Sequence, residues 1–494
     1  MASRLDNLAQ QRLDKLERIR SLGVDPYPRS YQRTHTNEET KELLKKNEEA
    51  GRIEPAQVSI AGRIMAIRKM GKSSFMDIQD GSGKIQLIFA NTNQLPENSL
   101  ELFKNLDIGD FIGVKGGVMR TRTGEPTVHV DDFTLLSKSL LPLPEKYHGL
   151  QDVDARHRQR YLDLISNQEV RDTFKMRSRI ITAIRNYLNS KGFLEVETPV
   201  LQPSAGGALA KPFITHHQSL DCDFYLRIAL ELHLKRLIIG GFDKVYELGR
   251  IFRNEGLSIK HNPEFTMLES YQAYADYKDV MNMLEDMISS VIKEISGNYK
   301  FHYGDNVIDF TPPWQRLDLR ETLIKYSGID FMQFPDVDSL RKEMQKRHME
   351  VDPAKDRGRL IDELLSTFVE PHLIQPTILY DYPLDMSPLA KKKPGYDNIV
   401  ERFEAYVCGM ELANAFSELN DPIDQRQRFI NQQRNQGKDE EQEVIDEDFL
   451  TAMAYGMPPT GGLGVGIDRL VMLLTNQQSI REVILFPQLK EKDQ

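Results

Sequence analysis

Residues 249–277 read GRIFRNEGLSIKHNPEFTMLESYQAYADY and gather charged and aromatic side chains around one glycine. Apolar residues alternate on both sides, which predicts two antiparallel strands joined by a turn. We expect Arg253 and Glu255 to share one face of the arriving strand, and Gly256 to permit the reversal. On the returning strand, the two-residue period places three side chains on a single face: Phe265, Glu269 and Tyr271.

Such a hairpin would present a cation, aromatic rings and carboxylates on one surface. This set suits an anionic, planar ligand that carries amino groups, as a nucleotide does. A salt-bridged surface hairpin would explain any one of these residues more simply. The number of them within one short stretch favours a ligand site.

The composition is that of an ordinary globular protein. With 494 residues, 40% hydrophobic and 28% charged, the chain is long enough for about two to four domains. No apolar run approaches the ~20 residues that span a bilayer, and the stretch MASRLDNLAQQRLDKLERIR is too charged for a signal peptide. Because Cys222 and Cys408 lie far apart, we expect no disulfide framework, no zinc site and a reducing, cytoplasmic setting.

The net charge of −10 argues against a protein that coats nucleic acid by bulk attraction. The charge is uneven, however. The first 150 residues carry 22 basic and 20 acidic side chains, whereas the remainder carries 42 and 54. We therefore expect the N-terminal third to be the place where a phosphate backbone is met.

From residue 57 to about residue 139 the pattern changes to short strands with glycine turns. Five such strands, with a helix before the fourth, predict an OB-fold barrel over residues 56–145, a fold that often binds single-stranded nucleic acid. Residues 1–55 predict a helical extension. The sequence LPLP at residues 141–144 predicts a stiff connector at the domain boundary.

Within this barrel, Phe75 and Gln86 fall on the polar faces of two consecutive strands. Met76 and Ile78 form the apolar face, so Phe75 points the other way. There its ring could stack on a base, an interaction worth about 1–3 kcal/mol, and the Gln86 amide could bind a base edge. A lone exposed phenylalanine under a loop explains the same pattern, and both interpretations stay open at this point.

Glycines and charges mark a third region, residues 461–470, which read GGLGVGIDRL. Glycines let the backbone approach a ligand closely, and a helix that begins near Asp468 would carry Arg469 in its first turn. The pattern fits neither a Walker loop nor a dinucleotide fingerprint. Simple packing of a strand against a helix is the alternative.

Carboxylates recur in surroundings that are otherwise apolar. Glu404 and Glu411 flank a turn at residues 408–409, so a hairpin could bring both to one Mg²⁺ ion as oxygen ligands. Asn414, Phe416 and Glu418 lie at alternate positions, so a strand would place them on one face. Three acids lie among apolar residues: Glu231, Glu269 and Glu418. A buried carboxylate needs a cationic partner, which is either an internal lysine or arginine or a cationic ligand.

Together these stretches resemble the signatures of class II aminoacyl-tRNA synthetases. KGFLEVETPVLQP, with Pro199, is similar to the dimer-interface signature of that class, and GRIFRNEGLSIKHNPEFTMLE and GLGVGIDRLVMLL are similar to the second and third signatures. PSAGGALAKPFITHH, DYPLDMSPLAK and ELANAFSELNDP are similar to segments of the bacterial lysyl-tRNA synthetase family. The resemblance covers nearly the whole chain.

The resemblance implies an α+β fold: an anticodon-binding OB domain, then a catalytic domain over residues 146–494 with a six-stranded antiparallel sheet flanked by helices. We expect helical insertions at about residues 315–375 and 421–456. The implied activity is that of a lysine–tRNA ligase, with ATP, L-lysine and lysine tRNA as substrates and more than one Mg²⁺ ion. The implied assembly is a homodimer formed through the segment around Pro199.

The resemblance also implies roles for particular residues. For ATP these are Arg253, Glu255, Lys260, His261, Asn262, Phe265, Glu404, Glu411 and Arg469, with Glu404 and Glu411 holding Mg²⁺. For lysine they are Gly207, Glu231, Arg253, Glu269, Tyr271, Asn414, Phe416, Glu418 and Gly464. For the central uridine of the anticodon they are Phe75, Gln86 and Glu125. As catalytic residues, Arg253, His261 and Arg469 would neutralise charge when the lysine carboxylate attacks the α-phosphate.

Four positions depart from the usual pattern of that family. Lys260 stands where arginine is common, which loses a bidentate phosphate contact but keeps the charge. Ser270 replaces an apolar residue. Asp154 and His157 stand where glutamate and tyrosine are more usual. None of these positions carries an implied chemical role except Lys260.

Three alternatives compete with lysine–tRNA ligation. An aspartyl- or asparaginyl-type synthetase has the same scaffold, but Glu269 and Glu418 would repel an acidic substrate. A relative that lysylates an elongation factor lacks an anticodon barrel. A non-catalytic relative that binds nucleic acid would not need Arg253 and Arg469 together with the two metal-binding glutamates.

Overall fold

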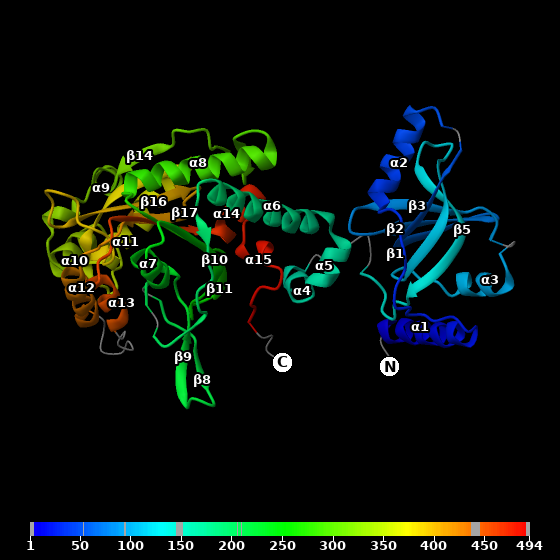
Figure 1. The fold of residues 1–494 in the computed structure, drawn as a ribbon, viewed down its shortest axis with the longest axis horizontal. Helices are drawn as coiled ribbons and strands as arrows, with labels where there is room; N and C mark the ends of the chain where they lie inside the picture. Colours follow the sequence, from blue (N-terminus) through cyan, green and yellow to red (C-terminus); the bar gives the residue numbers. More distant parts are fainter. Residues whose placement is uncertain are drawn as a thin grey trace. The chain divides into compact units, whose positions relative to one another are not determined.

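The computed structural model describes residues 4–52, 54–92, 95–144, 152–204, 206–208, 210–435 and 445–490. The chain divides into two compact units, residues 1–149 and 150–494 (Figure 1). The domain boundary expected at residues 145–146 lies outside the described residues. In the ranges given above, no helix is long and apolar enough to cross a membrane.

The first unit is a closed five-stranded barrel with strand order β1-β2-β3-β5-β4, preceded by two helices. Its elements are α1 (Arg4–Ser21), α2 (Asn37–Glu49), β1 (Ala56–Met70), β2 (Ser73–Gln79), β3 (Lys84–Phe89), α3 (Glu97–Lys104), β4 (Phe111–Arg120) and β5 (Pro126–Ser137). The number of strands and the helix before the fourth strand agree with the sequence pattern. The expectation of an OB-fold barrel is therefore confirmed.

The interior of the barrel is filled by alternate residues of its strands, as a period of two requires. Met76 and Ile78 of β2 are almost fully buried. Phe103 of α3 packs its ring edge-on against Phe89 and Phe133, with ring centroids 4.9 Å and 6.2 Å apart. Helix α3 therefore contributes to the barrel core.

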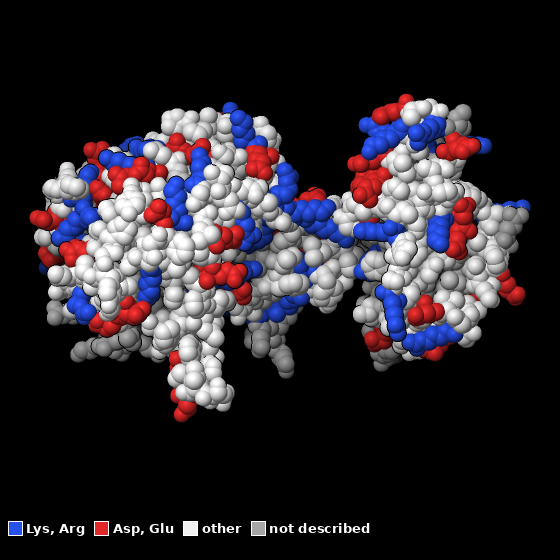
Figure 2. Space-filling view, viewed as in Figure 1, with Lys and Arg blue, Asp and Glu red and all other residues white. Residues whose placement is uncertain are grey.

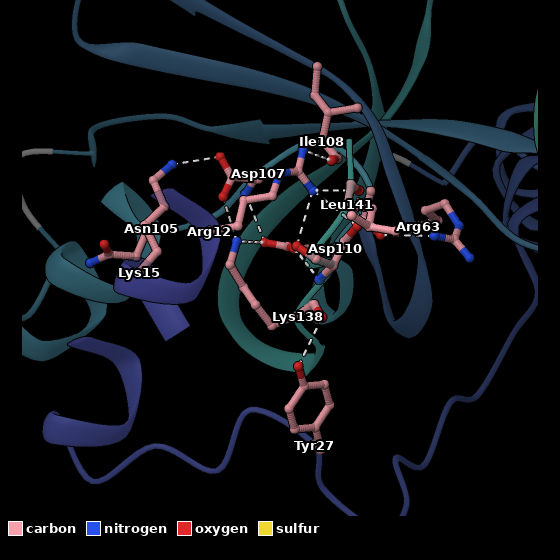
Figure 3. A network of polar contacts seen from close by, with 12 residues as sticks. Arg12, Lys15, Tyr27, Arg63, Asn105, Asp107, Ile108, Asp110, Lys138 and Leu141 are labelled. Carbon is pink, nitrogen blue, oxygen red and sulfur yellow. Dashed lines mark hydrogen bonds and ion pairs between the residues drawn. The ribbon is translucent and has the colours of Figure 1, made fainter. Parts of the chain in front are cut away.

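A polar network ties α1 to the barrel (Figure 3). The side chain of Lys138 is completely buried, and its Nζ lies 2.6 Å from Asp107 and 2.9 Å from Asp110. Lys15 of α1 pairs with the same Asp107 at 2.6 Å, and Arg12 donates to the carbonyl oxygen of Ile108 at 2.9 Å. A buried ammonium group thus has two carboxylate partners, which burial requires.

The second unit is built on one large sheet with strand order β14-β15-β16-β17-β18-β11-β10-β6. Its first half contains α4 (Val153–Arg158), α5 (Arg160–Ser166), α6 (Gln168–Ser190), β6 (Leu194–Glu195), β7 (Leu201–Gln202), β8 (Ile214–His217), β9 (Cys222–Leu226), α7 (Glu231–Ile239), β10 (Lys244–Phe252) and β11 (Glu264–Ala273). Strands β7, β9 and β8 form a separate small sheet, whose β8–β9 hairpin projects from the unit in Figure 1.

The second half completes the sheet and adds most of the helices. It contains α8 (Tyr277–Ser296), β12 (Lys300–Tyr303), β13 (Asn306–Asp309), β14 (Gln315–Asp318), α9 (Leu319–Ser327), α10 (Val337–Lys346), α11 (Arg357–Leu364), β15 (Thr377–Pro383), β16 (Ile399–Val407), β17 (Met410–Ser417), α12 (Pro422–Asn435), α13 (Glu447–Ala454), β18 (Thr460–Gly466), α14 (Ile467–Leu474) and α15 (Ile480–Val483).

The six central strands of the large sheet, from β15 to β10, are antiparallel, which confirms the expected fold class. Two short strands extend it: β14 pairs parallel to β15, and β6 pairs parallel to β10. Helices α6, α8 and α14 pack on one face and bury the main core with the inward residues of the strands. Helix α7 packs against β10 and β11.

The structure corrects three details of the sequence interpretation. Strand β10 ends at Phe252, so Arg253 and Glu255 lie in a loop rather than on the strand. Gly256 does not adopt the left-handed conformation of a tight turn, because the reversal is spread over residues 253–263. The expected helical insertion at 315–375 begins with a strand, β14, before its helices.

Ser270 of β11 carries a hydroxyl group that is buried without a hydrogen-bond partner among the described residues. The residue is 1% exposed and lies between Tyr246 and Leu463 on the neighbouring strands. This serine replaces the apolar side chain that the family pattern leads one to expect, so a polar atom faces the core.

We predict that Ser270→Ala raises the free energy of unfolding by about 1 kcal/mol, because it removes an unsatisfied buried polar group. The matched control is Ser289→Ala. Ser289 is equally buried, and its Oγ donates to the carbonyl oxygen of Phe310 at 2.9 Å, so its loss should be destabilising by about 1 kcal/mol. Urea unfolding measures both changes, and equal destabilisation by the two variants would contradict the prediction.

Candidate active site

Two cavities adjoin on the face of the large sheet opposite the main core. The first has a volume of about 310 Å³ and the second of about 300 Å³. Four residues line both cavities and mark where they meet: Arg253, Met267, Asn414 and Gly464. Antiparallel pairing sets this arrangement, because Gly464 of β18 lies opposite Glu269 of β11 on one side and Asn414 of β17 on the other.

The first cavity gathers every residue that the sequence assigned to lysine. These nine residues are Gly207, Glu231, Arg253, Glu269, Tyr271, Asn414, Phe416, Glu418 and Gly464. They come from two loops, from the start of α7, from β11, β17 and β18, and from the residue that directly follows β17. Their assigned roles stay predictions, but the fold brings segments more than 200 residues apart to one place.

Three carboxylates of this cavity are buried: Glu231 is 6% exposed, Glu269 4% and Glu418 1%. Glu269 accepts hydrogen bonds from the backbone N–H of Leu230, at the start of α7, and from the Tyr271 hydroxyl, at 2.9 Å and 3.0 Å. Burial, and then the charge of Glu231, raises the pKa of Glu269 to about 7. A cationic ligand would favour the ionised form of all three acids.

Lys235 is the internal cation of this acidic cluster. Its side chain is completely buried, and its ammonium group pairs with both Glu231 and Glu418. Burial opposes the charge of Lys235, but the two carboxylates outweigh burial and raise its pKa. The other carboxylate oxygen of Glu418, Oε1, is buried over Gly462 and has no hydrogen-bond partner among the described residues.

Gly462 also lines the first cavity, and sequence reasoning missed it. A Cβ atom at this position would lie 1.9 Å from Glu418 Oε1 and 2.7 Å from the ring of Tyr271. Only glycine leaves space for both side chains. The glycine-rich stretch at residues 461–466 contains Gly462, but of its glycines only Gly464 was predicted to belong to the lysine site.

Arg402 of β16 is a second residue that sequence reasoning missed. It lines the first cavity, and its Nε donates to Asn414 Oδ1 at 3.0 Å. Its other nitrogens bind Glu404 and the carbonyl oxygen of Met386. Arg402 therefore orients Asn414. Arg402 lies two residues before Glu404 on one strand, and this spacing could have indicated that the two side chains share a face.

The second cavity gathers eight of the nine residues assigned to ATP: Arg253, Glu255, Lys260, His261, Asn262, Phe265, Glu411 and Arg469. Arg469 donates to the backbone oxygen of Glu411 at 2.7 Å and to its carboxylate at 3.2 Å, and it lies 3.3 Å from His261 Nε2. Burial, followed by the charge of Arg469, lowers the pKa of His261. The guanidinium group of Arg253 lies 5.3 Å from the centroid of the Phe265 ring.

Glu404, the ninth residue assigned to ATP, lines neither cavity. It accepts hydrogen bonds from Tyr382 at 2.8 Å and from Tyr406 and Arg402. Burial is the largest cause of its raised pKa, and the charge of Glu411 adds to it. The two glutamates are therefore close enough to interact, across a hairpin turned by Cys408 and Gly409, whose φ angles are 51° and 65°.

The residues assigned to the anticodon lie on the barrel. Phe75 of β2 is half-buried and pairs with Ile88 of β3, while Gln86 pairs with Thr127 of β5 and accepts its hydroxyl hydrogen bond at 2.9 Å. Glu125 is exposed in the turn before β5. On the face drawn in Figure 2, basic and acidic side chains are interspersed over this unit, so recognition there would depend on particular contacts rather than on bulk attraction.

Comparison with protein families agrees with this geometry. Residues 152–490 match the family described as tRNA synthetases class II (D, K and N), and residues 58–136 match the OB-fold nucleic acid binding domain. The chain belongs to the class II tRNA synthetases. The second unit of this synthetase is thus its catalytic part, and the barrel is its OB-fold domain.

The synthetase is similar to curated relatives over nearly its whole length. A lysine–tRNA ligase of Dehalococcoides mccartyi is 65% identical over 98% of both chains. The lysine–tRNA ligase of Moorella thermoacetica is 54% identical over 99% of both chains, and that of Listeria monocytogenes is 51% identical over 98% of this chain and 97% of its own.

The raised pKa of Glu269 predicts a pH-dependent stability for the unliganded synthetase. Because the folded protein holds this proton more tightly than the unfolded chain, the contribution to stability is complete below pH 4.5 and is lost as the pH rises through about 7. Between pH 5.5 and 8, we expect the unfolding free energy of the parent to fall by about 2 kcal/mol more than that of Glu269→Gln.

Urea unfolding at the two pH values measures this difference. Glu264→Gln is the control, because Glu264 lies on the same strand with its side chain 50% exposed, and it should keep the pH dependence of the parent. Parallel pH profiles for the parent and Glu269→Gln would contradict the assignment of this proton to Glu269.

Proposed function

We propose that the chain is a lysine–tRNA ligase. It joins L-lysine to ATP as lysyl-adenylate, with release of pyrophosphate, and then transfers the lysyl group to the 3′ end of lysine tRNA. The observation that carries this proposal is the first cavity. It buries three carboxylates beside an aromatic residue, Phe416, and it opens at Arg253 toward the second cavity.

In this proposal, lysine lies with its ammonium groups among the carboxylates. Glu231 would accept from the α-ammonium, and Glu269, Tyr271 and Glu418 would surround the ε-ammonium. The methylene groups would lie along Phe416. The carboxylate of lysine would then point to Asn414 and Arg253, where the two cavities meet.

ATP would fill the second cavity. Phe265 and Arg469 lie on its walls and would hold the adenine between a ring and a guanidinium plane. Glu255 would accept from the adenine amino group, while His261, Asn262 and Lys260 would meet the phosphates. Lys260 now donates to the carbonyl oxygen of Gly409 at 3.0 Å, so it would exchange this partner for a phosphate oxygen.

Of the two glutamates assigned to Mg²⁺, Glu411 lines the second cavity, whereas Glu404 would have to exchange its hydrogen bonds with Tyr382, Tyr406 and Arg402 for the ion. Among the described residues, no group of three or more metal-binding side chains is present, but Mg²⁺ is usually held by one or two carboxylates together with phosphate oxygens. Glu404 and Glu411 would supply the carboxylates. The ion would neutralise charge on the ATP phosphates.

The chemistry needs no protein nucleophile, because the lysine carboxylate is already ionised at neutral pH. An oxygen of that carboxylate would attack the α-phosphorus, and the bond to the bridging β-phosphate oxygen would break as pyrophosphate leaves. Arg253, His261 and Arg469 would neutralise the charge that develops. The positioning of the two substrates, by Arg253 where the cavities meet and by His261 and Arg469 in the second cavity, would supply most of the acceleration.

We further propose a homodimer formed through the segment around Pro199. Short strand β6 lies at one edge of the large sheet. Large apolar side chains near this edge are exposed to solvent in the single chain: Leu194 is 47% exposed, Leu201 47% and Phe242 46%. An exposed apolar surface at a sheet edge favours an interface.

The free cysteines, Cys222 and Cys408, agree with the expected cytoplasmic setting.

ATP–pyrophosphate exchange tests the proposed function most simply. The full chain should exchange labelled pyrophosphate into ATP in the presence of lysine and at background level with aspartate or asparagine. An aspartate-dependent exchange would favour the alternative synthetase, and a lack of exchange with all amino acids would favour the non-catalytic relative.

We predict that Phe75→Ala lowers the rate of tRNA charging by roughly tenfold, because one base loses its stacking partner. Lysine-dependent exchange should stay at the parent level. Ile108→Ala is the control, since this side chain is 40% exposed on the same unit but has no assigned role. A parallel loss of exchange in Phe75→Ala would contradict a separate anticodon-reading function for the barrel.

A further inference from the structure

The negative charge of the first cavity is partly neutralised by Lys235, a side chain that would not contact a substrate. Lys235 is not among the residues that line the cavity, yet its ammonium group lies between Glu231 and Glu418. It also lies 5.5 Å from the ring centroid of Phe416. A cation held behind the wall of a cation-binding cavity requires a reason, because at first sight it competes with the substrate.

The charges give that reason. The titratable side chains that line the cavity are Glu231, Arg253, Glu269, Tyr271, Arg402, Glu418 and Asp446. Arg402 pairs with Glu404, and Asp446 pairs with Arg236. Glu231, Glu269 and Glu418 remain, and with Lys235 they carry two net negative charges when all are ionised. Free lysine brings two ammonium groups, and its carboxylate would meet Arg253.

We propose that Lys235 is a positioning residue that sets the charge of the lysine cavity. It holds Glu231 and Glu418 in place and cancels one of three buried negative charges, so that the remaining two match the two ammonium groups of the substrate. This inference rests on the proposed lysine specificity.

The position of Lys235 supports this role. It lies one helical turn after Glu231 in α7, so the two side chains lie on the same face of the helix. Glu418 directly follows β17, and its Oε1 is buried without a hydrogen-bond partner among the described residues. Lys235 thus pairs with Oε2 of Glu418, whereas Oε1 has no partner among the described residues. A buried carboxylate without any cation would take up a proton instead.

The test is a double-mutant cycle in lysine-dependent exchange, with Lys235→Met, Glu418→Gln and the double variant. Glu418→Gln alone leaves the cavity one negative charge short, and we expect KM for lysine to rise at least tenfold. Removing Lys235 in addition frees Glu231 from its internal partner. The double variant should therefore have a KM for lysine at least threefold lower than that of Glu418→Gln.

KM for ATP separates this role from a general loss of structure. KM for ATP should stay within twofold of the parent value in all folded variants. Glu418 lines only the first cavity and Lys235 lies behind it, so neither residue lines the second cavity. If Lys235→Met alone does not fold, the comparison of Glu418→Gln with the double variant is sufficient. The double variant removes the charges of Lys235 and Glu418 together, so that of the two carboxylate partners of Lys235 only Glu231 keeps its charge.

Lys138→Met is the matched control. Lys138 is also completely buried between two carboxylates, Asp107 and Asp110, but it lies in the barrel unit (Figure 3). Its loss should lower the stability of the barrel and leave KM for lysine unchanged.

Additive effects of the two substitutions, or a double variant with a higher KM for lysine than Glu418→Gln, would overturn the proposal. Either result would leave the proposed function intact, provided that exchange in the parent depends on lysine. A parent that shows no dependence on lysine would instead refute the proposed function before the cycle is measured.

Discussion

The burial of three carboxylates in one cavity is the constraint on which the rest of the site depends. Glu231, Glu269 and Glu418 are each less than 10% exposed, and isolated carboxylates are costly to bury. Fixed partners offset this cost. The backbone N–H at the start of α7 and the Tyr271 hydroxyl donate to Glu269, and Lys235 pairs with Glu231 and Glu418. A cationic ligand would balance the remaining negative charge, which otherwise favours uptake of a proton, and we propose that this makes the cavity selective for cations.

The antiparallel sheet makes such burial possible. Strands β17, β18 and β11 lie side by side, so that Asn414, Gly464 and Glu269 form one row across the sheet. Glycine at position 462 leaves the space that Glu418 and Tyr271 fill. Because one face of the sheet holds the apolar core under α6, α8 and α14, polar residues at alternate positions such as Glu269 and Asn414 lie on the other face, at the cavities. Fold and site therefore follow from the same two-residue period.

Strand periodicity and glycine spacing were sufficient to predict the barrel, while resemblance to the family predicted the six antiparallel strands and the residues of both cavities. What periodicity missed depends on contacts between distant segments. The hairpin loop was taken as a tight turn at Gly256, although the reversal extends over residues 253–263. The sequence left an internal lysine or arginine and a cationic ligand as two open explanations for the buried acids, because no sequence pattern shows that Lys235 reaches them. Glu404 proved to be enclosed by Tyr382, Tyr406 and Arg402.

The central claim is that buried negative charge selects the substrate by its side-chain ammonium group. Calorimetric titration of the full chain with lysine and with norleucine, which has the same chain length without the ε-ammonium group, tests it most directly. The structure predicts that lysine binds at least a hundredfold more tightly than norleucine, roughly 3 kcal/mol or more. Affinities within tenfold of each other would contradict the claim, because the cavity would then be recognising shape rather than charge.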